Sequence, residues 1–143
     1  MTDLLHRIAI QSPPDAVRRA VTTTEGFRSW WTDDCETVPE EGAVNVFRFH
    51  RGAVELRFRV DELSPGRVRW TCVPADRVPE EWVGTRIAFD LSPDGKGGTV
   101  LRLGHLGWRS SDGQLPDCNT VWGELLHRLK DYAEGRPRGP YVT

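Results

Sequence analysis

The sequence has few cysteines, no long apolar stretch and no run of one charge, and each shortage excludes a class of protein. The three cysteines at positions 35, 72 and 118 are an odd number with wide, unrelated spacing. They include no Cys-x-x-Cys pair and do not form the framework of a disulfide-rich secreted domain. No segment approaches the roughly 20 apolar residues that a membrane-spanning helix needs. We therefore expect no membrane span and no disulfide scaffold.

The charges nearly cancel and are dispersed along the chain. Lys and Arg number 19 and Asp and Glu number 21, which gives a formal net charge of −2 at pH 7. Nucleic-acid binding needs a patch of positive charge, and here the arginines alternate with apolar residues. We predict that nucleic acid is not a partner. The first seven residues include an early acid and no apolar run of signal-peptide length, so we expect a cytoplasmic protein.

The length suits one domain. A chain of 143 residues buries roughly 68% of its unfolded surface, which is enough for a substantial core. Hydrophobic residues make up 38% and charged residues 28%, as in globular proteins. The turns recur at regular intervals, with no repeat or linker between them. We predict a single domain over residues 1–143.

The N-terminal third predicts one strand followed by two short helices. Leu4–Ile10 begins the strand, and Ser12-Pro13-Pro14-Asp15 is typical of a helix start, with Ser12 as the expected cap. A second short helix is expected from Thr24 onward. Its apolar side gathers three aromatic rings: Phe27, Trp30 and Trp31.

The middle of the chain predicts a meander of antiparallel strands. Residues 53–63 alternate strictly between apolar and charged side chains, which is typical of a strand with one buried face. Later segments alternate in the same way and follow one another through short turns, as in antiparallel sheets. The inward side chains expected from these strands include Phe58, Trp70, Phe89, Leu103 and His105.

The chain closes with a strongly amphipathic segment. Apolar residues recur at helical spacing between positions 117 and 134, the predicted span of a long helix. Gly135 and Pro137 then favour its termination. The apolar side consists of Val121, Trp122, Leu125, Leu126, Leu129, Tyr132 and Ala133.

This order of elements resembles the helix-grip fold of the START-like (SRPBCC) superfamily, which includes polyketide cyclases and birch-pollen-allergen-like proteins. Residues 24–32, 84–89 and 122–132 are similar to the branch named after the activator of the heat-shock-protein-90 ATPase. The resemblance spans nearly the whole chain. It implies an α+β fold in which a curved antiparallel sheet wraps around a long C-terminal helix, with two short helices after the first strand.

The resemblance also implies an apolar cavity, because a curved sheet and a straight helix diverge. Aromatic walls with a few polar groups are the usual design of a small-molecule site. The same side chains could instead pack solidly as core, and the sequence leaves both possibilities open. The expected lining consists of Trp30, Trp31, Phe58, Trp70, Phe89, Leu103, His105, Trp122 and Leu126.

Few residues suggest chemistry. His105 stands in an apolar strand, where it could orient a ligand or exchange a proton near neutral pH, or simply bond backbone or water. The other histidines and the cysteines lack metal-ligand spacing, so we expect no metal and no cofactor. No nucleophile–base pattern or carboxylate pair nominates a catalytic residue.

Three functions follow from the resemblance. The favoured one is a binding module for a small apolar or amphipathic molecule. An enzyme of the polyketide cyclase, dehydratase or hydrolase type would use the same cavity. An interaction module would contact a chaperone, and a homodimer is also open. A cavity of several hundred Å³ supports the first two functions, whereas a filled core with an exposed apolar patch supports the third.

Overall fold

The structure is a computed structural model that describes residues 2–142. Within these residues the chain forms one seven-stranded antiparallel sheet, in the order β1-β7-β6-β5-β4-β3-β2. The strands are β1 (Thr2–Ile10), β2 (Cys35–Glu36), β3 (Val44–Phe49), β4 (Val54–Ser64), β5 (Arg67–Cys72), β6 (Arg86–Pro93) and β7 (Thr99–Trp108). The helices are α1 (Pro14–Ala20), α2 (Thr24–Trp30), the 3-10 turn η1 (Glu80–Trp82) and α3 (Leu115–Ala133).

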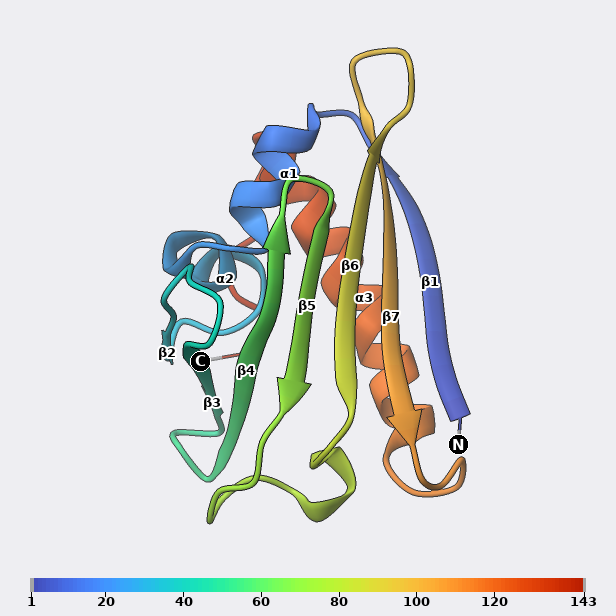
Figure 1. Cartoon of the computed structure of the whole chain (residues 1–143). Coiled ribbons are helices and arrows are strands. Elements are labelled where there is room, and N and C mark those ends of the chain that lie inside the picture. The colour runs from blue at the N-terminus through green and yellow to red at the C-terminus, as the bar shows by residue number, and fades with distance from the viewer. Residues whose placement is uncertain (1, 143) are drawn as a thin grey trace.

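The long helix α3 crosses one face of the sheet, and α1 and α2 lie beside it (Figure 1). Its predicted apolar stripe is confirmed, because Trp122, Leu125, Leu126 and Leu129 are buried. The helix begins two residues before the predicted start, since Pro116 fits the first turn of a helix that starts at Leu115. The predicted α+β helix-grip fold is confirmed.

The two short helices are fixed by close backbone packing. Ser12 is not the cap of α1: Pro13 occupies that position, and the Ser12 carbonyl accepts a hydrogen bond from Thr99 Oγ1 at 2.7 Å. Thr23 caps α2 by accepting from Gly26 N at 3.0 Å. A Cβ atom on Gly26 would lie 2.7 Å from the Ala20 carbonyl oxygen, so this corner accepts only glycine. The close approach brings the aromatic side of α2 into the core.

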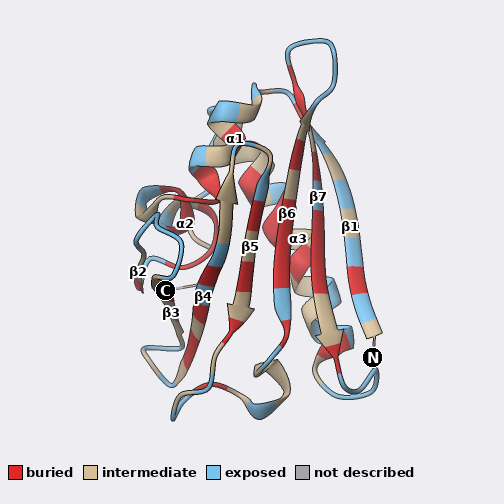
Figure 2. Cartoon of the chain, viewed as in Figure 1, coloured by how far each residue is buried: buried red, intermediate tan, exposed pale blue. Residues whose placement is uncertain are grey.

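Aromatic rings fill the centre between the sheet and the helices. Phe47 lies 5.0 Å from Phe27 and 5.7 Å from Trp70, measured between ring centroids. Trp70 in turn lies 5.4 Å from Phe58 and 5.3 Å from Phe89. These are contact distances for aromatic pairs. Buried residues alternate along β5, whereas β6 and β7 contain continuous buried stretches at residues 87–89 and 103–105 (Figure 2). This part of the core is solid.

The two edges of the sheet differ in length. At one edge β2 has 2 residues, which pair with Val46 and Phe47 in the middle of β3. At the other edge β1 has 9 residues and pairs with β7 along its length. The free side of β1 has no strand partner among residues 2–142.

Candidate functional site

A cavity of about 840 Å³ lies between α3, the β3–β4 hairpin, η1 and the last described residues. This volume is in the range of small-molecule sites. Exposed residues, His50 and Tyr141 among them, mark its open side. Its wall consists of Trp31, Phe49, His50, Val54, Leu56, Pro79, Trp82, Gln114, Asp117, Cys118, Val121, Trp122, Leu125, Tyr141 and Val142.

The predicted lining residues separate into two groups. Trp31 and Trp122 lie in the cavity wall. The other seven lie in the packed interior, each at most 3% exposed: Trp30, Phe58, Trp70, Phe89, Leu103, His105 and Leu126. Alternation along a strand identifies which side chains face the helix. It does not identify where along the sheet the distance to the helix becomes large enough to leave a cavity. That separation occurs at the β3–β4 end, beyond the aromatic centre.

Several wall residues were not predicted as lining. Val121 and Leu125 belong to the predicted helical stripe, so the stripe was a usable signal for them. Trp82 lies in η1 after a polar, proline-bearing loop, and only its aromatic character could have drawn attention to it. Tyr141 follows the end of the last helix and gave no signal.

A buried hydrogen-bond chain supports the cavity wall from behind. Trp122 Nε1 donates to His105 Nδ1 at 3.0 Å, and His105 Nε2 lies 3.0 Å from Thr85 Oγ1. Thr85 Oγ1 donates to the Trp82 carbonyl oxygen at 2.7 Å. Since Nδ1 accepts, the neutral ring has its proton on Nε2 and donates it to Thr85. This series of hydrogen bonds therefore connects the backbone of Trp82 to the indole of Trp122, and both tryptophans lie in the cavity wall.

His105 is a buried, neutral imidazole that holds the indole of Trp122 in place. Its burial lowers the pKa of the imidazole to about 3, so the ring is neutral at pH 7. Both ring nitrogens are engaged within the protein. The sequence left open ligand orientation, proton exchange near neutral pH, or bonds to backbone or water; in the structure the ring bonds two side chains, those of Trp122 and Thr85.

The polar groups of the wall are few and mostly engaged. Gln114 Oε1 accepts from Trp82 Nε1 at 2.8 Å. Burial, together with the charges of Asp117 and Glu81, raises the pKa of the Cys118 thiol to about 12. A thiol with that pKa stays protonated at pH 7 and is a poor nucleophile. The wall is thus an apolar surface with hydrogen-bonding groups near its opening.

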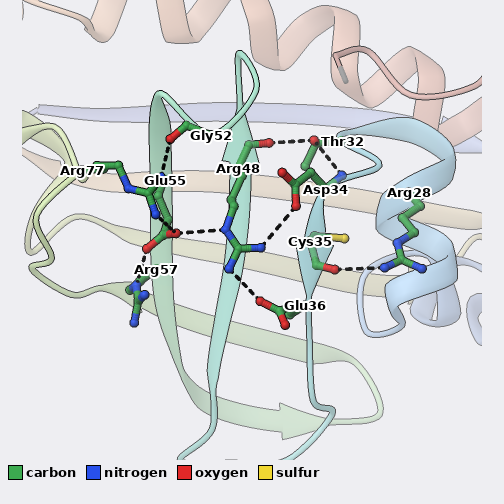
Figure 3. A network of polar contacts seen from close by, with 10 residues as sticks. All are labelled: Arg28, Thr32, Asp34, Cys35, Glu36, Arg48, Gly52, Glu55, Arg57 and Arg77. Carbon is green, nitrogen blue, oxygen red and sulfur yellow. Dashed lines mark hydrogen bonds and ion pairs between the residues drawn. The ribbon is translucent and has the colours of Figure 1, made fainter.

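A network of ion pairs holds the hairpin turn at the cavity mouth (Figure 3). Buried Glu55 accepts from Arg57 Nε at 2.6 Å and from one nitrogen each of Arg48 and Arg77 at 3.0 Å. These hydrogen bonds, that of Arg57 foremost, lower the pKa of the Glu55 carboxyl. Arg77 also donates to the Gly52 carbonyl oxygen at 2.7 Å. The network therefore links the sheet to the turn that follows β3.

That turn is strained. His50 and Arg51 have φ values of 54° and 58°, in the left-handed region that side chains with a Cβ rarely adopt. Each such residue costs on the order of 1 kcal/mol. Contacts of Arg77 with Gly52 and Glu55 offset part of this cost and keep His50 at the cavity opening.

The segment after α3 completes the wall. Val142 N donates to the Trp31 carbonyl oxygen at 3.1 Å, and Val142 forms a parallel bridge with Thr32. Arg128 on α3 donates to the Gly139 carbonyl oxygen at 3.1 Å and lies 5.6 Å from the centre of the Tyr141 ring. These contacts place Tyr141 and Val142 against the cavity.

Two further features concern metals and membranes. In the part of the chain that the structure describes, no group of three or more His, Cys, Asp or Glu side chains is placed to hold a metal ion. None of the helices formed by residues 2–142 has the length and apolar character of a membrane span.

Comparison with known proteins shows the family. Residues 11–134 match the family described as "Activator of Hsp90 ATPase homolog 1-like protein". The chain belongs to this family. The match includes most of the residues of the cavity wall, and the stretches 24–32 and 122–132 supply its two predicted members, Trp31 and Trp122. No curated protein matches the chain.

Solved structures agree with this membership of the Hsp90-ATPase-activator-like family. The solution structure of the Aha1 dimer from Colwellia psychrerythraea is 34% identical, with a TM-score of 0.83 over 94% of this chain and 98% of that chain. Protein MLL2253 from Mesorhizobium loti is 20% identical, with a TM-score of 0.81 over 93% and 97%. CalU16 from Micromonospora echinospora is 21% identical, with a TM-score of 0.73 over 94% and 76%. The last two show the shared fold only.

Proposed function

We propose that this protein binds a small apolar or amphipathic molecule in the cavity between α3 and the β3–β4 hairpin. The observation that supports this most is a cavity of about 840 Å³ in a protein whose centre is otherwise packed with aromatic rings. An unfilled apolar space forfeits packing contacts. A ligand of matching size would restore them.

The distribution of groups in the wall suits an amphipathic ligand. Trp31, Phe49 and Trp122 offer ring surfaces on the inner side. Gln114 and Asp117, at the start of α3, offer an amide and a carboxylate. An apolar body would pack on the rings, and a polar head would remain near these two residues.

The cavity is tested with a neutral naphthylamine probe whose emission rises in apolar surroundings. Val121→Trp should fill part of the cavity and reduce probe binding at least about tenfold, since binding depends on the free volume. Val44→Trp is the matched control, because Val44 is exposed on β3 outside the cavity wall. Equal probe binding by both variants, each folded by circular dichroism, would contradict the proposal.

The natural ligand is sought by native mass spectrometry of protein purified without denaturation. We expect a mass adduct on the unmodified chain that is lost in Val121→Trp and retained in Val44→Trp. An adduct present equally in both variants would point to binding outside the cavity.

A homodimer is the protein partner we propose. The relative from Colwellia psychrerythraea, which is 34% identical, is described as a dimer. A chaperone contact, suggested only by the family's description, is tested with the same preparations by pull-down with purified chaperone. Binding that persists in Val121→Trp would separate such a contact from the cavity.

A further inference from the structure

The open edge of the sheet is the feature that the ligand cavity leaves unexplained. Strand β1 is the outermost strand of the sheet, and α3 passes behind its neighbours β7 and β6 (Figure 1). Its 9 residues contain no proline and have no partner on their free side among residues 2–142. A free edge exposes unpaired backbone N–H and C=O groups, and monomeric proteins usually shorten or cover such edges. The opposite edge, β2, has only 2 residues.

The side chains on the outer face of β1 are also unusual for a solvent-facing edge. Leu5 is 76% exposed, whereas the next most exposed large apolar residue, Val38, is 45% exposed. Asp3 and Arg7 stand two residues to either side of Leu5, and both are exposed. Because side chains alternate along a strand, Asp3, Leu5 and Arg7 share one face. The β1–β7 register shifts between Thr2 and Leu4, and Asp3 Oδ1 accepts from Gly107 N at 2.9 Å, so the exposed Asp3 carboxylate has its second oxygen to offer across the edge.

The pattern Asp-x-Leu-x-Arg is complementary to itself in antiparallel pairing. A two-fold axis at Leu5 would set the leucines of two copies opposite each other. It would also set Asp3 of each copy opposite Arg7 of the other. Opposite charges at directly facing positions stabilise a sheet, and like charges destabilise it. A register shift of two residues would set Leu5 against a charged residue instead.

We infer that β1 is the surface through which two copies of this chain pair, antiparallel and centred on Leu5, to form one continuous sheet. The inference rests on the homodimer proposed above and specifies its interface. Its symmetry is that of an isologous two-fold contact, the commonest kind in homodimers. The cavity lies at the other end of the sheet order, beside β3 and β4. A monomeric variant should therefore still bind the naphthylamine probe.

The test measures self-association of the full chain by sedimentation velocity between about 1 and 200 μM. The unmodified chain should sediment as a dimer at the upper end. Arg7→Asp would oppose aspartates at two places across the axis, and we expect the dissociation constant to rise about tenfold or more. Arg86→Asp is the matched control, because Arg86 is exposed on β6, an interior strand. It should leave the dimer unchanged.

A charge exchange tests the register. The double variant Asp3→Arg/Arg7→Asp restores opposite charges at both facing positions, so dimer formation should return. Amide hydrogen exchange of the unmodified chain supplies a second measurement, in which protection of residues 2–10 should increase with protein concentration.

Three results would overturn the inference. They are a monomer at 200 μM, a dimer indifferent to Arg7→Asp, and a double variant that dimerises no better than Arg7→Asp alone. None of these results bears on the cavity. Loss of probe binding in a folded, monomeric Arg7→Asp would instead count against the separation of the two sites.

Discussion

The centre of the sheet and its β3–β4 end meet the helices in opposite ways. At the centre, Trp70 and Phe89 contact each other and are almost fully buried. At the β3–β4 end, Phe49 and Val54 are only half-buried and border open space. The same sheet thus provides a solid support on one side and a hollow on the other. We expect most of the stability to come from the first region, and the second is where we propose that a ligand binds.

The largest effect expected from this contrast is on the free energy of unfolding. Trp70→Ala should lower it by about 3–5 kcal/mol, because a large cavity would open in the packed centre. Val121→Ala should lower it by less than about 1 kcal/mol, since its side chain already borders the cavity. Urea unfolding of both variants measures the difference. Similar losses would show that the two regions are packed alike.

A smaller effect concerns the boundary between the two regions, where His105 lies. The pKa of His105 is lowered from 6.5 to about 3 in the folded protein, so between these values the unfolded chain binds the additional proton. Acid therefore favours unfolding, and stability present above pH 6.5 is lost as the pH falls. The loss attributable to His105 between pH 6.5 and pH 5 is on the order of 2 kcal/mol.

The control for His105 is His105→Gln, which can accept from Trp122 and donate to Thr85 without titrating. Urea unfolding at several pH values should show a shallower decline for this variant than for the unmodified chain. Identical slopes would mean that the imidazole does not titrate as its burial requires.

The smallest effect concerns the charge of a ligand at the mouth of the hollow region. Among residues 2–142, the wall includes the carboxylate of Asp117 and no lysine or arginine. Decyltrimethylammonium should therefore bind about two- to fivefold more tightly than decanoate, a difference limited by the exposure of Asp117. Aromatic rings also attract such cations. Titration calorimetry measures both ligands, and Asp117→Asn should reduce the preference to the part that the aromatic rings contribute; tighter binding of decanoate would contradict it.

Much of the fold could be predicted, because it depends on local periodicity. Alternation placed Trp70 and Phe89 on the inner face, and helical spacing placed Trp122 and Leu126 against the sheet; all four are buried. The prediction of Ser12 as the helix cap was wrong. It considered only neighbouring residues, whereas the Ser12 carbonyl oxygen accepts a hydrogen bond from Thr99, which is distant in sequence.

The site was less predictable, because its wall depends on contacts between distant segments. Trp82 reaches the cavity through η1 and its bond to Gln114, and Tyr141 reaches it through the chain that follows α3. Neither placement follows from a repeat or a motif. The two anticipated wall residues, Trp31 and Trp122, lie in stretches similar to the family, but Trp30 and Leu126 lie in the same stretches and are buried in the packed interior, so the similarity did not separate wall from core.

The link between Val142 and Trp31 has a consequence for the order of assembly during folding. Its two ends are far apart in sequence, and closing so long a loop costs more entropy than forming the hairpins between neighbouring strands. We expect the β3 to β7 meander to form early and this contact to form late. A chain emerging from the ribosome would then acquire its packed centre before its cavity wall is complete.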